Sequence, residues 1–170
     1  CDWSSDVALP IFTGDLEDVT LPNGEVIDDV KINASAQSID GPSGILGQAG
    51  PDLLRPNSFL PYTGTMAFDS ADLASMESNH TLFAVILHEM GHVIGIGTIW
   101  SYKGLLSGAG GSDPRFTGAQ ATAAYNRIFH NTEASVPVEN QGGGGTRDAH
   151  WRESTMPYEV MRSEEHTSEL

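Results

Sequence analysis

The stretch that decides the fold is LFAVILHEMGHVIG, residues 82–95. It is apolar almost all the way round, and a helix of this composition is normally buried. Thr81 precedes it as a residue type that caps helix N-termini, and Gly95 follows as a residue type that ends helices. The sequence therefore predicts a buried helix over residues 81–94.

Three polar side chains interrupt this apolar helix, namely His88, Glu89 and His92. Burying them without partners would cost several kcal/mol, roughly 1–3 kcal/mol for each neutral polar group and more for a charge. At 100° per residue the two histidines lie about 40° apart and one turn up the helix, so both rings can reach one ion. Glu89 is offset on the same side, where it can hold a metal-bound water without being a ligand. This is the HExxH arrangement of zinc proteases.

The chemistry predicted from this motif is hydrolysis of peptide bonds by Glu-assisted attack of a zinc-bound water. Zinc binds neutral imidazoles and lowers the pKa of its water towards ~7. Glu89 would accept the proton of that water as general base and return it to the leaving amine. The alternative interpretation is two satisfied core histidines and a chance glutamate. The position of the motif within one long apolar helix disfavours that alternative.

A catalytic zinc site also needs a third protein ligand and an open fourth position. The extended metzincin pattern HExxHxxGxxH places this ligand three residues after the glycine. Thr98 occupies that position and is not a normal zinc ligand, so the third ligand must come from further along the chain. The downstream candidates are His130, Glu133, Glu139, Asp148 and His150.

These candidates are not equal. His130 ends a predicted amphipathic helix and is more easily interpreted as a partner of that helix's dipole. Glu133 and Glu139 lack the local pattern expected of a glutamate ligand. Asp148 ends a GTRD segment that resembles aspartate-ligand zinc proteases, but the tyrosine-glycine that those enzymes carry next is absent. His150 is therefore the favoured third ligand, and Asp148 is the alternative.

The segment 88–95, with His150 and Trp151 after a long insertion, resembles the leishmanolysin family of metzincins. In that family an inserted segment separates the third histidine from the glycine, and a tryptophan follows this histidine. A Met-turn methionine comes soon after, and Met161 corresponds to it here. The resemblance implies that His150 is the third zinc ligand. It also implies that Met161 forms the hydrophobic floor beneath the zinc without being a ligand; an ordinary core methionine is the alternative.

Two further segments, residues 44–51 (GILGQAGP) and residues 66–73 (MAFDSADL), resemble bacterial members of this group. The resemblance therefore spans most of residues 25–161. It implies an α+β, metzincin-like zinc protease domain, with a twisted mixed sheet over the HExxH helix and a lower C-terminal subdomain. The segment 64–68 would be the edge of the cleft, to which a substrate peptide adds by β-pairing. The family's C-terminal helix, N-terminal prodomain and disulfides have no counterpart in the sequence.

Local patterns predict a few more elements. Residues 30–39 alternate loosely and contain β-branched side chains, which predicts a strand, and residues 64–68 predict a second strand. The glycine-rich residues 41–51 are expected to form a loop. Residues 69–77 are expected to make a short helical turn, and residues 117–130 an alanine-rich helix.

We interpret residues 1–161 as one metallopeptidase catalytic domain, incomplete at both ends. Residues 162–170, RSEEHTSEL, read like the translation of a sequencing-library adapter. We therefore expect them to be a non-native tail.

The chain is strongly acidic, with a formal net charge of −15 and no basic stripe, which argues against nucleic acid as a partner. This composition is typical of a soluble extracellular protein, so we expect secretion. No apolar run reaches the ~18 residues of a membrane-spanning helix. Acidic pairs near the N-terminus are candidate calcium ligands, although a solvated acidic face is favoured because no EF-hand loop is present. These residues are Asp15, Glu17, Asp18, Asp28 and Asp29.

The sequence as a whole predicts a secreted zinc metalloendopeptidase that acts on protein or peptide substrates. Its metal ligands would be His88, His92 and His150, and its general base Glu89. One rival is a zinc protease that uses Asp148 as third ligand. The other is a secreted, non-catalytic module with a structural zinc site, which would be closed by a fourth protein ligand. Glu89 argues against that module, because a structural site has no use for its carboxylate.

Overall fold

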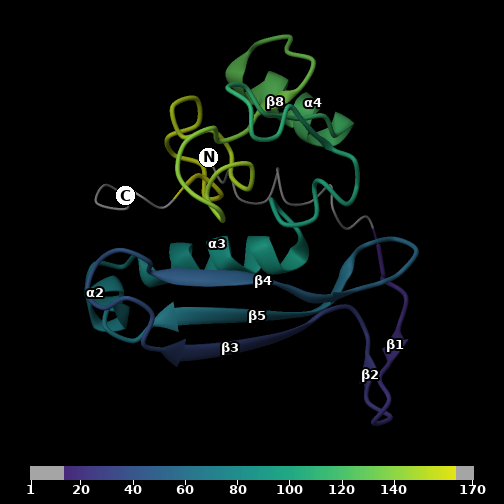
Figure 1. The fold of residues 1–170 in the computed structure, drawn as a ribbon, viewed down its shortest axis with the longest axis vertical. Coiled ribbons are helices and arrows are strands. Elements are labelled where there is room, and N and C mark those ends of the chain that lie inside the picture. Colours follow the sequence, from purple (N-terminus) through teal and green to yellow (C-terminus); the bar gives the residue numbers. More distant parts are fainter. Residues whose placement is uncertain (1–13, 164–170) are drawn as a thin grey trace. The chain divides into compact units, whose positions relative to one another are not determined.

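The computed structural model describes residues 14–163 (Figure 1). The chain divides into two compact units, whose described parts are residues 14–95 and residues 96–163. Each unit has its own hydrophobic core. The structure is α+β, with several sheets and few helices, which confirms the predicted fold class at that level. No helix of the described part is both long and apolar enough to cross a membrane.

The first unit is built on a three-stranded mixed sheet with the strand order β3-β5-β4 (Figure 1). Strand β3, Lys31–Gln37, runs parallel to β5, Pro61–Asp69. Strand β4, Gly47–Leu54, runs antiparallel to β5. A short hairpin of β1, Val19–Thr20, and β2, Val26–Ile27, precedes this sheet.

The strands predicted over residues 30–39 and 64–68 are confirmed as β3 and β5, but two related predictions are wrong. Residues 41–51 are not a loop throughout, because β4 begins at Gly47 and pairs with β5 although it has no β-branched residue. Residues 64–68 are not an edge either, because β5 is paired on both sides. Within the described residues, β3 and β4 are the two edge strands of this sheet. An edge strand tolerates Pro51, which has no N–H to donate.

The helix predicted over residues 81–94 is present as α3, Leu82–Ile94. Thr81 occupies the position before it, but its side chain makes no capping hydrogen bond to the helix. Gly95 ends the helix in the left-handed conformation at φ 114°, as predicted. A short helix, α2, Leu73–Ser78, precedes α3. Helix α3 packs against β4 and β5. The buried core of this unit consists of Met66, Phe68, Met76, Val85 and Val93.

Asp69, at the end of β5, fixes the loop that leads into β4. Its fully buried carboxylate accepts hydrogen bonds from the N–H groups of Ile39, Asp40 and Gly41, and from that of Ala71. The bonds from Ala71 and from the loop amides lower the pKa of Asp69 to about 2, so the carboxylate is ionised at neutral pH. The start of β4 is therefore tied to the strand with which β4 pairs.

The second unit has less regular structure than the first. Strands β6, Leu106–Ser107, β7, Arg115–Phe116, and β8, Val136–Pro137, form a small antiparallel sheet in that order. Its helix α4, Ala119–Phe129, confirms the helix predicted over residues 117–130. Loops connect these elements, and isolated β-bridges join Trp151 to Val138 and to Arg162.

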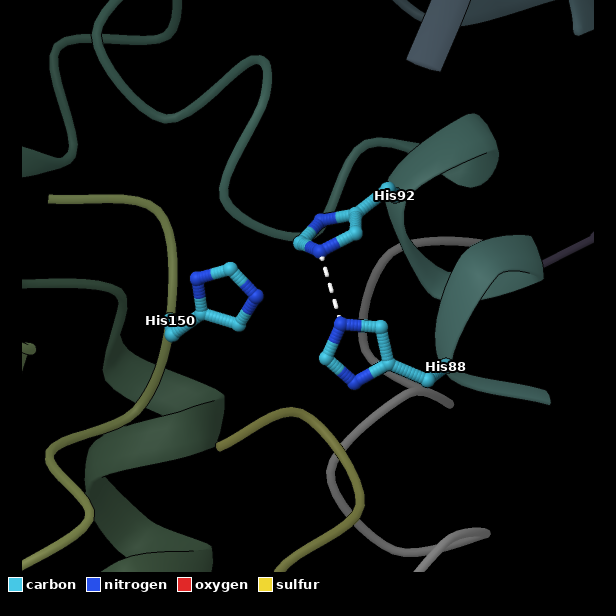
Figure 2. Close-up of side chains that lie close together, drawn as sticks. All are labelled: His88, His92 and His150. Carbon is cyan, nitrogen blue, oxygen red and sulfur yellow. Dashed lines mark hydrogen bonds between the residues drawn. The ribbon is translucent and has the colours of Figure 1, made fainter. Parts of the chain in front are cut away.

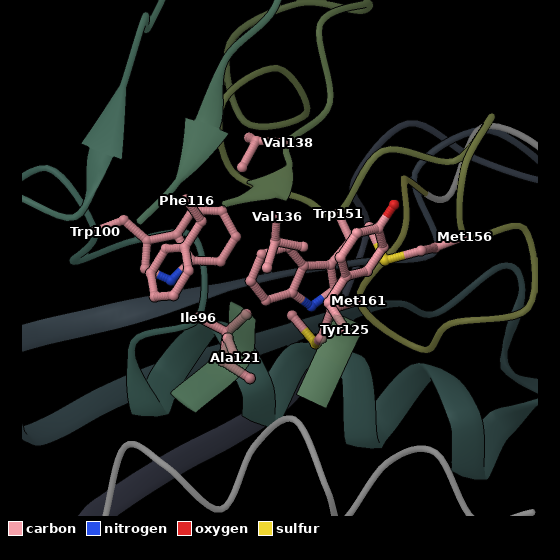
Figure 3. Packing of buried hydrophobic residues seen from close by; sticks show 10 residues of the cluster. All are labelled: Ile96, Trp100, Phe116, Ala121, Tyr125, Val136, Val138, Trp151, Met156 and Met161. Carbon is pink, nitrogen blue, oxygen red and sulfur yellow. The ribbon is translucent and has the colours of Figure 1, made fainter. Parts of the chain in front are cut away.

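Aromatic rings form the centre of the second core (Figure 3). The ring centroids of Trp100 lie 4.9 Å from Phe116 and 4.6 Å from Trp151, and those of Phe116 and Trp151 are 5.4 Å apart. The first two pairs are tilted and the third meets edge to face, and aromatic pairs at these separations stabilise a core beyond the area they bury. Because Trp151 follows His150 directly, this core holds the backbone next to the candidate ligand.

The last described residues, Arg162 and Ser163, are buried in the second unit. The backbone N–H of Arg162 donates to the carbonyl of Glu159, and the hydroxyl of Ser163 donates to the carboxylate of Glu153. Residues 164–170 of the predicted non-native tail lie outside the described residues.

Candidate metal centre

Helix α3 presents two histidine side chains from one face. His88 and His92 are four residues apart, and both are buried, with exposed fractions of 4% and 7%. Their Nε2 atoms lie 3.0 Å apart, and the two rings meet edge to face (Figure 2). The spacing of one helical turn therefore does what the sequence predicts, which is to aim two imidazole nitrogens at one point.

Glu89 follows His88 on the same helix and is one of the most deeply buried side chains of the structure, at 2% exposure. On one side its carboxylate lies against the backbone of β4 at Gly47. A buried carboxylate is costly unless other groups compensate for the lost hydration. Glu89 is therefore not a solvent-exposed residue that follows His88 by chance.

His150 lies on a loop of the second unit and is also buried, at 6% exposure. Its Nδ1 is 2.9 Å from the carbonyl oxygen of Thr146. That carbonyl can only accept, so Nδ1 carries the proton and Nε2 is left as an acceptor, which is the tautomer that a metal needs. Burial lowers the pKa of His150 below its usual value, which favours the same neutral form.

Close packing fixes the backbone beside His150. A side chain at Gly97 would place its Cβ 1.9 Å from the carbonyl oxygen of Ala149. Gly97 also has a positive φ of 79°, so neither the space nor the backbone conformation there suits another residue type. The chain after α3 can thus approach Ala149 closely only because position 97 is glycine.

Three histidines come together in the structure. Among residues 14–163, His88, His92 and His150 form a group whose ligand atoms all lie within 4.8 Å of one another, and all three residues are buried (Figure 2). Such a group could hold a metal ion. Two nitrogens on one tetrahedral zinc, each at roughly 2.0–2.1 Å, are about 3.3 Å apart. The 3.0 Å between the helical Nε2 atoms is close to that value.

Three of the other candidates for a third ligand have hydrogen-bond or ion-pair partners within the second unit. One oxygen of Asp148 accepts the N–H of Gly110. Glu139 accepts N–H groups of Asn140, Gln141 and Glu153. Glu133 is exposed and pairs with Arg115, and His130 is the exposed residue that ends α4. None of the four belongs to the three-histidine group among the described residues.

Unlike the three histidines, the candidate calcium carboxylates of the described residues do not form a group that could hold an ion. Asp29 uses one oxygen to accept the N–H of Leu16. Within residues 14–163, no three of these acidic side chains bring their oxygens close enough together to share an ion. The solvated acidic face, which the sequence favoured, remains the simpler interpretation.

Met161, the predicted Met-turn methionine, is 2% exposed and belongs to the core of the second unit (Figure 3). Its backbone N–H donates to the carboxylate of Glu159 at 2.5 Å, and its carbonyl accepts the N–H of Trp151. Both bonds fix the turn that carries Met161. Its place beneath a bound metal stays a prediction.

Glu159 gives this turn a pH dependence that is open to measurement. Burial raises the pKa of Glu159 to about 7, although the hydrogen bond from Met161 and the charge of Arg162 act in the opposite direction. The folded chain therefore keeps a proton that the unfolded chain releases near its usual pKa of 4.5. Stability contributed by this group is present below about pH 4.5 and is lost as the pH rises to about 7.

Glu159→Gln is expected to remove this loss. The amide oxygen can still accept the N–H of Met161, but it carries no charge to desolvate. The free energy of unfolding should match that of the wild type near pH 4.5 and exceed it by roughly 3 kcal/mol at pH 8. Urea unfolding across this range measures the difference, with Glu77→Gln, a change of an exposed residue on α2, as the control. Parallel pH curves for wild type and Glu159→Gln would contradict the assignment.

Two groups that shape the site were not among the predicted residues. The carbonyl of Thr146 orients His150. Every residue has a backbone carbonyl, so a pattern of side chains cannot predict which one accepts this bond. Gly47 lies against Glu89, and a glycine inside a strand is the signal that marks such a close approach. That signal was hidden because residues 41–51 were expected to be a loop.

Comparison with known proteins adds no relative: no family model matches the chain, and no curated protein matches it.

Proposed function

We propose that this chain is a zinc endopeptidase, with His88, His92 and His150 as metal ligands and Glu89 as general base. The observation that carries the proposal is the group of three buried imidazoles, with a buried carboxylate beside one of them on the same helix. The resemblance of residues 88–95 and 150–151 to the leishmanolysin family agrees with it. The substrate would be a protein or peptide.

The chemistry of the three side chains supports a metal. The tautomer of His150 set by Thr146 leaves its Nε2 as an acceptor, and one ion can accept lone pairs from several imidazole nitrogens at once. Zinc bound there would supply a Lewis acid that polarises a carbonyl and lowers the pKa of a coordinated water towards ~7.

Glu89 supplies the proton transfers that peptide hydrolysis requires. Its carboxylate would take a proton from the attacking water and pass it to the nitrogen of the leaving amine, so it ends the cycle ionised as it began. Burial on an α-helix packed against a sheet gives this carboxylate a fixed direction. A base held in place avoids the entropic cost of finding its orientation at each turnover.

The number of protein ligands in the group supports a catalytic site, which needs an open coordination position. A structural zinc site takes four protein ligands, whereas a catalytic site takes three and keeps one position open. Among the described residues, the group contains three His, Cys, Asp or Glu side chains and no fourth. This count favours the catalytic interpretation over the structural one.

Casein cleavage by the purified chain tests the proposal. We expect cleavage that stops with 1,10-phenanthroline and returns when zinc is added back. Cleavage that survives the chelator would contradict a metal-dependent mechanism. One tightly bound zinc per chain without any cleavage of casein or of peptide libraries would favour the structural module instead.

A further inference from the structure

Gly47, the first residue of edge strand β4, lies directly against the carboxylate of Glu89. A Cβ at position 47 would be 2.6 Å from Oε1 of Glu89 and 3.0 Å from both its Cδ and its Cγ. Gly47 has no positive φ, so its backbone does not require glycine. What requires glycine at this position is the space that Glu89 occupies.

The direction of side chains along β4 explains this contact. Successive residues of a strand point to opposite faces, so positions 47 and 49 share a face. Ala49 packs against the core cluster of the first unit, which places both positions on the side of the sheet that meets α3. Gly50 points to the opposite face, where an added Cβ would meet nothing within 4 Å. Within β4, therefore, Gly47 is fitted to Glu89, whereas Gly50 is not constrained by space.

We propose that Gly47 is a positioning residue for Glu89. By leaving out a side chain, it lets the carboxylate lie against the β4 backbone and so sets the direction in which the oxygens of Glu89 point. This inference goes beyond the ligand set and the base, but its effect on turnover rests on the proposed function.

The consequence of filling this space falls on Glu89 rather than on the fold. The atoms that an alanine at position 47 would strike are Cγ, Cδ and Oε1 of Glu89, all in one side chain and none in the backbone. Gly64 of β5 provides the contrast. A Cβ there would lie 2.4 Å from Cγ1 of Val93 and 2.8 Å from the carbonyl oxygen of Gly50, and that backbone oxygen cannot rotate away. An alanine at position 64 must therefore disturb the packing of α3 on the sheet.

Three single alanine variants separate these effects. Gly47→Ala should lower kcat roughly 10–100-fold with little change in KM, because a misplacement of about 1 Å is enough for such a loss. Its zinc content and thermal midpoint should stay close to those of the wild type. Gly50→Ala, on the same strand, should leave all four quantities unchanged. Gly64→Ala should lower the thermal midpoint instead.

A double variant and a crystal structure complete the test. In the Glu89→Gln background, Gly47→Ala should cause no further loss of kcat, because the group it displaces is already inactive. The crystal structure of Gly47→Ala should show the Glu89 carboxylate moved until its contacts with the new methyl reach the ordinary 3.4–4 Å.

The outcomes distinguish this inference from the proposed function. If the wild type cleaves no peptide, the proposed function fails, and the position of Glu89 in the Gly47→Ala crystal still decides the positioning role. An unmoved carboxylate would overturn that role. So would a kcat no lower than that of Gly50→Ala, or an equal further loss in the Glu89→Gln background.

Discussion

Replacing Glu89 by glutamine is expected to reduce peptide hydrolysis by about 10²–10⁴-fold while the zinc content stays at the wild-type value. Glutamine has nearly the same shape and fills the same buried space, but its amide cannot accept a proton from water. The change therefore removes the base and leaves the three imidazoles in place. Initial rates on casein and metal analysis of the same sample measure the two effects together.

The matched control for this variant is Glu77→Gln. Glu77 is an exposed glutamate on α2 of the same unit, so its replacement makes the same chemical change away from the histidines. Its activity should equal that of the wild type. Normal casein cleavage by Glu89→Gln would refute the assigned mechanism. Loss of zinc from this variant would show that Glu89 acts on the metal rather than on the proton.

Replacing His150 by alanine is expected to weaken zinc binding by more than about 100-fold and to abolish activity. Loss of a residue that merely supports a ligand costs 10–100-fold in metal affinity, so loss of a ligand should exceed that range. His88 and His92 alone would leave the ion with two protein ligands. Competition with a chromogenic chelator measures the affinity, and casein cleavage measures the activity.

Two variants in the same unit serve as controls for His150→Ala. His130 has φ 52° and Asp148 has φ 66°, and asparagine tolerates this left-handed conformation, so His130→Asn and Asp148→Asn are expected to fold. Both should bind zinc as the wild type does. If zinc and activity survived in His150→Ala but were lost in Asp148→Asn, the third ligand would be Asp148.

The parts that sequence could predict are those whose physics is local. Helix α3, its end at Gly95 and the shared direction of His88 and His92 all follow from periodicity and one glycine within fourteen residues. The third histidine is different. Sequence offered five downstream candidates, because which of them reaches a metal depends on the path of some fifty residues of loop, sheet and helix.

The errors concern strand pairing. Strand β4 has glycine, alanine and proline where strands usually have β-branched residues, so its pairing with β5 comes from tertiary contacts and not from local preference. The placement of β5 in the centre of the sheet, instead of at its edge, follows from that pairing. Because β4 was not predicted, the contact between Gly47 and Glu89 could not be predicted either.

The central claim is that three histidines hold one catalytic zinc, and the most direct test is anomalous diffraction from zinc-loaded crystals on both sides of the zinc absorption edge. We predict one anomalous peak that is bound by His88, His92 and His150, with no fourth protein side chain on the ion. A peak elsewhere, or a peak closed by a fourth side chain, would contradict the account.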